Sequence, residues 1–291
     1  MKNFFKILPF LILSFFIFFY SKDISESIIS VINIWKNNLV PSLFPFLIVS
    51  KFLINYNIPF RLFNLNPGCS FIFIMSMLSG FPSSAKYTKD LLLKNVISPD
   101  DANRIMLFSH FANPAFVLIT LGSNFLKQPN VGYLILFSHY FSNVIIGFFV
   151  MFGKNNKRIN YSFKSEPFNV VLNSSIREAM STLFLILGTL ITYSIVITVF
   201  NKLPINFYYK TILSGLLELT SGLKGICLLD ISLRLKAAIS SMLLSFGGLA
   251  IHTQITSIYN INYFKFLKFR ILQAIISFFI TYFLFNLIYH L

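Results

Sequence analysis

The segment from Met75 to Lys86 reads MSMLSGFPSSAK, and it interrupts an apolar run that begins at Phe71. The interruption consists of Gly80 and Pro82 among several serines. Inside a bilayer, the backbone N–H and C=O groups that such a break releases are tolerated only where protein or a polar cavity satisfies them. Two interpretations are therefore open: a binding site at membrane depth, or an ordinary turn outside the lipid.

The composition of the whole chain is that of a membrane protein. Of its 291 residues, 56% are hydrophobic and 11% are charged, whereas roughly 25% are charged in a typical soluble domain. We therefore predict an all-α polytopic protein of the cell membrane, in contact with the lipid bilayer. Uncharged runs approaching or exceeding the ~20 residues that a span needs occupy Leu8 to Ser21, Val131 to Gly153, Met180 to Asn201, Ala237 to Phe264 and Ile271 to Leu291.

The net charge of +15 does not call for a nucleic-acid partner, because basic cytoplasmic loops account for it and no zinc-finger spacing or RNA-binding motif accompanies it. Cys69 and Cys227 lie in apolar surroundings without a CxxC or CxxH context, which argues against metal binding and redox chemistry. We expect neither a cofactor nor enzyme activity, since GxSxG, HExxH and Walker A motifs are absent. Without an ATP site, any transport is secondary or facilitative, or borrows energy from a partner.

The chain divides into five parts by hydropathy and charge. The first part combines a span with an amphipathic helix that ends near Trp35 and is expected to lie at the membrane interface. Two repeats follow, separated by a basic loop, and a last span closes the chain. The parts are residues 1–37 (span and interfacial helix), 38–153 (first repeat and following span), 154–167 (basic cytoplasmic loop), 168–264 (second repeat) and 265–291 (C-terminal span).

The two repeats are interrupted at matching positions. Ser79-Gly80 in the first half corresponds to Ser221-Gly222 in the second, and Ala112-Asn113-Pro114 corresponds to Gly247-Gly248. Weak internal symmetry with broken segments in both halves is typical of transporters whose site lies at the repeat interface. The predicted structural breaks are Gly80, Pro82, Pro114, Gly222, Gly247 and Gly248.

The positions of Lys and Arg predict the orientation, because cytoplasmic loops are enriched in them. Lys2 and Lys6, the loop 154–164 and the stretch from Lys265 to Arg270 are placed in the cytoplasm. A single broken span from Gly68 to Val96 would put three lysines outside, against this rule. We predict instead a re-entrant hairpin that enters from the cytoplasm and turns at Gly80 to Ser84.

The broken helix from Ser98 to Phe125 then crosses the membrane, with Ser98 as its N-cap. In the second half, the hairpin spans Thr211 to Lys236 and the crossing helix spans Ala237 to Tyr259, in the opposite sense. The predicted fold is thus an inverted repeat of two units, each with a span, a re-entrant hairpin and a broken transmembrane helix, plus flanking spans.

Five segments of the chain carry a family resemblance: LVPSLFPFLIVS (39–50), SGFPSSAK (79–86), SHFANPAFV (109–117), LLELTSG (216–222) and LSFGGLAIHTQ (244–254). They resemble the YlbJ family of sporulation integral membrane proteins over most of the chain, from about Trp35 to Phe264 on the predicted spans. The resemblance implies the nucleoside-recognition or Gate domain, which occurs in spore maturation proteins A and B and is similar to the core of concentrative nucleoside transporters. It implies a role in sporulation, around spore cortex formation, with no established substrate.

Glu218 is the first candidate for a substrate-binding residue. It is the one carboxylate in the apolar stretch from Thr211 to Leu223 and stands beside a predicted break. Because a charge in the membrane interior is costly, such residues usually face a cavity and have a function. The alternative is that Glu218 pairs with Lys224 at a hairpin tip exposed to water.

Further candidates are polar residues near the breaks. The hydroxyls of Ser79, Ser83, Ser84, Thr220 and Ser221 are able to bind a polar ligand at the midplane; for any single serine the commoner alternative is a bond to a carbonyl of its own helix. Asn113, His252 and Gln254 lie on the crossing helices, and for a histidine the alternative is a satisfied core residue. His110 and His139 are interpreted as core residues.

Two functional hypotheses remain open. The first is a secondary transporter or permease-like protein for an unidentified small polar solute. The second is a structural or assembly factor that has the fold without transport and acts through other sporulation membrane proteins.

Overall fold

The structure is a computed structural model that describes residues 2–56, 62, 65–151 and 165–289. Within this part the chain is helical and contains no strand, which confirms the all-α class. The predicted basic loop at 154–164 lies outside the described residues. Five helical stretches of the described part are long and apolar enough to cross a membrane: Ser21–Asn55, Pro129–Met151, Phe168–Asn201, Leu233–Ile258 and Tyr263–Leu287. The polytopic prediction agrees with these stretches.

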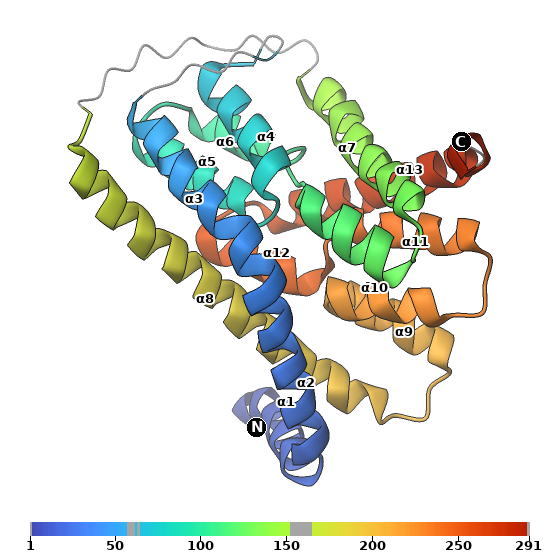
Figure 1. Cartoon of the computed structure of the whole chain (residues 1–291). Coiled ribbons are helices and arrows are strands. Elements are labelled where there is room, and N and C mark those ends of the chain that lie inside the picture. The colour runs from blue at the N-terminus through green and yellow to red at the C-terminus, as the bar shows by residue number, and fades with distance from the viewer. Residues whose placement is uncertain (1, 57–61, 63–64, 152–164, 290–291) are drawn as a thin grey trace.

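The elements follow one another in an order that occurs twice (Figure 1). A long helix is followed by two short helices, then by an interrupted segment and then by another long helix. The first set is α3 (Val40–Asn55), α4 (Pro67–Ser79) with α5 (Ser83–Leu93), α6 (Pro99–Ile105) with the π-helical segment η2 (Phe116–Phe125), and α7 (Pro129–Met151). The second set is α8 (Phe168–Asn201), α9 (Phe207–Leu217) with α10 (Leu219–Leu228), α11 (Leu233–Phe246) with α12 (Gly248–Ile258), and α13 (Tyr263–Tyr289). The inversion of the two sets relative to a membrane stays a prediction.

Both pairs of short helices are antiparallel hairpins. In α9 and α10, the backbones of Gly215 and Gly222 approach each other directly, and Gly225 lies beside Thr211. In α4 and α5, the start of α4 at Gly68 lies beside Val96, just past the end of α5. The predicted hairpin geometry therefore agrees with the structure in both halves.

The N-terminal region differs from the expectation of a separate interfacial helix. After α1 (Lys2–Phe19), helix α2 (Ser21–Ile34) continues through the π-helical segment η1 (Trp35–Leu39) into α3. The Trp35 indole donates to the carbonyl of Leu183 in α8 at 2.9 Å. Packing along α8 therefore keeps this stretch helical and in line with α3, as Figure 1 shows.

Two of the predicted breaks move. Gly222 is not a break: the chain leaves helical geometry at Glu218, and Gly222 is helical within α10. Its lack of a side chain serves another purpose, since a Cβ there would overlap the Gly215 backbone. In the first half, the predicted break was Ala112-Asn113-Pro114, whereas α6 already ends at Ile105, the chain is non-helical from 109 to 113 and Pro114 starts the next helical stretch.

Side chains from α7 and α13 satisfy the backbone of this unwound segment, as membrane burial requires. Asn143 donates to the carbonyl of His110 at 2.7 Å, and the Tyr140 hydroxyl donates to that of Ala112 at 3.1 Å. The amide of Ala112 donates to Nε2 of His139 at 2.9 Å. Arg270, fully buried, donates to the carbonyl of Leu107. Arg270 is thus part of the protein interior and not of the cytoplasmic basic stretch in which the sequence placed it.

Candidate functional site

The tip of the first hairpin is tied to the unwound segment. Gly80 ends α4 at a φ of 80° and passes so close to Asn113 that a Cβ would collide with its backbone. The Asn113 side-chain amide donates to the carbonyls of Ser79 at 3.2 Å and Leu78 at 3.4 Å. Its Oδ1 accepts from the amide of Ala115 at 2.8 Å. Asn113 therefore caps the helical stretch that leads into η2 and holds the hairpin tip at the same time.

Glu218 forms the tip of the second hairpin. Its backbone is extended, and its carboxylate accepts from the amides of Thr220 at 2.7 Å and Ser221 at 2.8 Å. The side chain thus caps the N-terminus of α10, where the helix dipole favours a negative charge. Glu218 is 3% exposed, and no ion pair joins it to Lys224. The alternative of a water-exposed Glu218–Lys224 pair is therefore wrong.

A small cavity of about 60 Å³ lies between the two hairpin tips. Its apolar lining comes from η1, α3, α8, α10 and α12 and from Phe81 and Phe116. Its polar lining joins residues from both halves, namely Ser42, Asn113, Glu218, Thr220 and Gln254. We call this space the inner cavity. Apart from Ser42, these polar residues are candidates from the sequence, which the fold brings together.

A larger cavity of about 320 Å³ also borders the Glu218 carboxylate. Its walls come from α2, the second half of α8, α9 and α10, and include Asn201, Phe207 and Lys224. Glu218, Thr220 and Leu190 line both spaces, and Ser221 lines the larger one. We call this space the outer cavity. Glu218 therefore stands where the two cavities meet.

The three serines of the first hairpin do not line either cavity. Ser79 donates to the carbonyl of Met75 at 2.7 Å and accepts from the Tyr87 hydroxyl at 3.1 Å. Ser83 and Ser84 are both buried, each with 1% of its surface exposed. The structure therefore places these three candidates inside the protein, behind the tip rather than on the cavity wall.

The break between α11 and α12 is held by His252. Gly247 and Gly248 have φ values of 90° and 71°, and Nε2 of His252 lies 2.8 Å from the carbonyl of Phe246. This histidine lines neither cavity and bonds the interrupted backbone instead. It therefore fits the alternative of a hydrogen-bonded core residue rather than a ligand-binding residue. Gln254 instead reaches the inner cavity and donates to the Thr189 hydroxyl at 2.8 Å.

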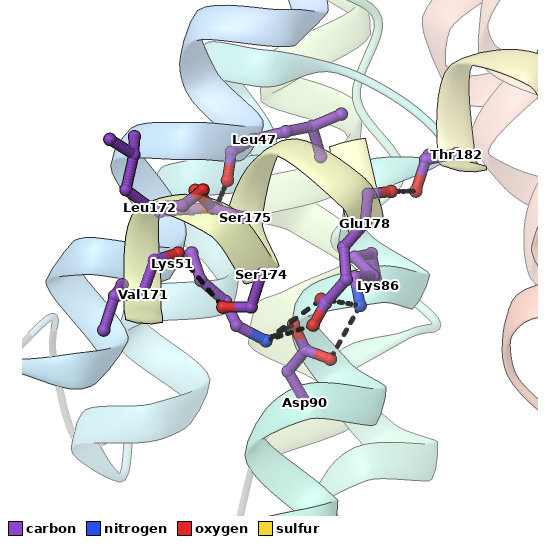
Figure 2. A network of polar contacts seen from close by, with 11 residues as sticks. Leu47, Lys51, Lys86, Asp90, Val171, Leu172, Ser174, Ser175, Glu178 and Thr182 are labelled. Carbon is purple, nitrogen blue, oxygen red and sulfur yellow. Dashed lines mark hydrogen bonds and ion pairs between the residues drawn. The ribbon is translucent and has the colours of Figure 1, made fainter. Parts of the chain in front are cut away.

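The structure brings together one polar cluster that the sequence did not indicate. Lys51 of α3, Lys86 and Asp90 of α5 and Glu178 of α8 form a continuous set of ion pairs (Figure 2). We call these four residues the ion quartet. Only the i,i+4 spacing of Lys86 and Asp90 is visible in the sequence; the partners on α3 and α8 are distant in the chain. Among the described residues, no group of three or more His, Cys, Asp or Glu side chains has the arrangement of a metal site.

Comparisons with known proteins bear on the identity of the chain. No family model matches it, and no solved structure matches it either. The chain is similar to the sporulation integral membrane protein YlbJ of Bacillus subtilis (strain 168), with 27% identity over an alignment of 333 positions that covers 94% of this chain and 82% of YlbJ. The chain is thus similar over most of its length to a protein named for sporulation, and the five apolar helical stretches of its described part indicate a multi-pass membrane protein.

Proposed function

We propose that the chain is a secondary, permease-like transporter that moves a small polar solute past Glu218. The observation that carries the proposal is the position of this carboxylate, buried at a helix interruption and bordering both cavities. An acid inside a membrane protein is costly and usually marks a pathway. Binding between interrupted helices of two halves is the general arrangement of secondary transporters.

The proposal also concerns the cellular process and the kind of solute. The resemblance to the YlbJ family supports a step in spore cortex formation, and the Gate-domain resemblance supports a polar solute. We infer transport rather than catalysis, because the polar groups around Glu218 are amides and hydroxyls suited to hydrogen bonding. They include no nucleophile paired with a base.

One observation favours the second hypothesis, an assembly factor without transport. The inner cavity of about 60 Å³ is far below the ~300–1,000 Å³ of typical ligand pockets. A transporter must therefore open this space during its cycle, whereas an assembly factor need not.

The test is a Glu218→Gln variant expressed in the native host. The amide still offers one oxygen to the α10 amides, so the fold is retained while the charge is lost. We expect heat-resistant spores to fall toward the number formed without the protein, at equal protein level in the membrane. Asp230→Asn is the matched control, because Asp230 is an exposed acid in the loop that follows α10. Normal sporulation with Glu218→Gln would contradict the proposal and favour the assembly factor.

A further inference from the structure

The ion quartet joins three elements that come from both halves of the fold. Lys86 of the first hairpin contacts Glu178 at 2.5 Å and Asp90 at 3.0 Å, and Lys51 contacts Glu178 at 2.9 Å and Asp90 at 3.7 Å. Figure 2 shows Glu178 reaching from α8 toward both lysines. Each acid thus has both lysines as partners. With two positive and two negative side chains, the cluster carries no net charge.

The quartet occupies the same seam between α3 and α8 that contains the inner cavity. The two helices are antiparallel there, with Leu43 and Ile186 lining the cavity and Lys51 and Glu178 meeting farther along. Eight residues separate the members of each pair along their helix, which corresponds to about 12 Å of α-helix. On both helices, the step from the cavity residue to the quartet residue leads toward the same end of the molecule. The quartet thus lies one step beyond the cavity, toward the end of the molecule where α3 ends and α8 begins, which we call the Asn55 end.

The opposite end of the seam is open. The outer cavity extends from Glu218 to Asn201 and Phe207, where α8 ends and α9 begins, and we call this the Asn201 end. Between the inner cavity and the quartet, in contrast, the seam is filled by the buried Leu47. A solute beside Glu218 therefore has a space toward the Asn201 end and a closed seam toward the Asn55 end.

The quartet lies partly exposed at the surface of the protein. The Glu178 side chain is 36% exposed, whereas the Asp90 side chain is 10% exposed. Charged groups with this exposure face water rather than lipid. Lys51, Lys86 and Asp90 are only 10–19% exposed, so removal of one partner leaves partly buried charge without compensation. Loss of a partner therefore favours separation of the first hairpin from α3 and α8.

From this placement we propose that Lys51, Lys86, Asp90 and Glu178 form the gate that closes the solute path at the Asn55 end. The inference rests on the proposed function, because it assigns a route to the solute. The quartet pins the first hairpin, whose Phe81 borders the inner cavity, to both α3 and α8. Separation of the pairs lets the hairpin move away from the seam and extends the cavity to the Asn55 end.

The gate is tested by thiol accessibility, which needs no knowledge of the solute. Cys69 and Cys227 are replaced by Ala, and Ser42→Cys supplies a single thiol on the wall of the inner cavity. A membrane-impermeant, charged methanethiosulfonate is applied to right-side-out and to inside-out vesicles. We expect the parent to react faster from the side of the Asn201 end. Glu178→Gln and Lys86→Gln should raise the rate from the side of the Asn55 end about three- to tenfold, as loss of a small ion-pair network predicts.

Two controls separate gating from general loosening. Lys86→Arg keeps the charge and should keep the low rate. Asp23→Asn removes a different ion pair, between Asp23 of α2 and Lys202 just after α8, at 2.5 Å. This pair lies at the Asn201 end, so its loss should leave the rate from the Asn55 end unchanged. A Ser138→Cys thiol, fully buried in α7, should stay unreactive in every variant and thereby report that the fold is intact.

The outcomes distinguish the gate from the proposed function. An unchanged rate from the Asn55 end in Glu178→Gln overturns the gate, and so does an equal increase in Asp23→Asn. A selective increase supports the gate even if Glu218→Gln sporulates normally, in which case the transport proposal fails by itself. If Glu218→Gln loses spores but Glu178→Gln and Lys86→Gln leave the thiol reaction rate unchanged, the transport proposal is supported and the gate is refuted.

Discussion

At the level of single residues, the interrupted helices are stabilised by side chains that bond the backbone. Asn113, Glu218 and His252 each lie at a break and each satisfies groups that regular helix would have paired. In a membrane the unsatisfied alternative costs several kcal/mol per group. These residues therefore have a structural task in addition to any role toward a solute.

Gly222 has a structural task of a different kind, which leads to a residue-scale prediction. A Cβ at this position would overlap the backbone of Gly215, which has no freedom to yield. Gly222→Ala should therefore separate α9 from α10 and destabilise the protein by ~1–3 kcal/mol, measured by thermal unfolding in detergent. Gly188→Ala is the matched control, because a Cβ there meets nothing within 4 Å and helix propensity predicts a neutral or slightly stabilising effect. Equal melting temperatures for both variants would refute this account of Gly222.

At the level of elements, each hairpin tip packs against an interruption. The first tip is tied to the unwound segment by Asn113, and Gly248 at the second break lies beside the backbone of Leu217 and Leu219 at the second tip. Each tie thus holds a hairpin tip against an interrupted segment. Phe81, Asn113 and Leu219, which lie at these meeting points, also line the inner cavity.

The tie formed by Asn113 predicts a local change in exchange. Asn113→Ser retains an oxygen that caps the helix start at Ala115 but is too short to reach the carbonyls of Leu78 and Ser79. The amide of Gly80, which closes the last turn of α4 on Ser76 at 2.9 Å, should exchange several-fold faster, since a hydrogen bond contributes ~1 kcal/mol. Ala115 should keep its protection. Hydrogen exchange by mass spectrometry checks both, with Ser123→Ala as a control in η2; unchanged exchange at Gly80 would show that another contact holds the tip.

At the level of the whole molecule, two sets of elements share one interior. His139 of the first set bonds Ala112 and lies 2.8 Å from Ser245, directly before the break in α11. Arg270 of the second set donates to the carbonyl of Leu107, in the turn just before the unwound segment of the first. The ion quartet adds a further connection between the sets near the Asn55 end. The two sets are therefore held together by polar contacts as well as by packing.

The orientation of the molecule in the membrane gives the last prediction. The positive-inside rule places the base of the first hairpin in the cytoplasm and that of the second outside. Lys89 and Asp230 are both exposed at these positions. In a background without Cys69 and Cys227, Lys89→Cys should react with an impermeant maleimide in inside-out vesicles only, and Asp230→Cys in intact cells only. External labelling of Lys89→Cys would refute the re-entrant hairpin.

Local features of the sequence determined the class of the protein and most of its breaks. Span length and hydropathy depend on runs of about 20 residues. Gly80, Pro82 and Gly247 interrupt helices through their own backbone preferences, so these breaks are recognisable from the sequence without knowledge of contacting residues. Ser98 caps α6 through the Asp101 amide as its local pattern predicts. Glu218 was also visible, because a lone acid in an apolar run is conspicuous wherever it folds.

Only the tertiary structure decided which groups meet. The opening segment MSMLSGFPSSAK contains a true hairpin tip, yet its serines face the interior, and the partner that positions the tip is Asn113 from the next segment. Arg270 was placed in a loop by its charged neighbours, although three-dimensional packing buries it against Leu107. Lys51 and Glu178 lie 127 residues apart in the chain. Such contacts depend on how helices pack across the molecule, and no local pattern of charge or hydropathy encodes that geometry.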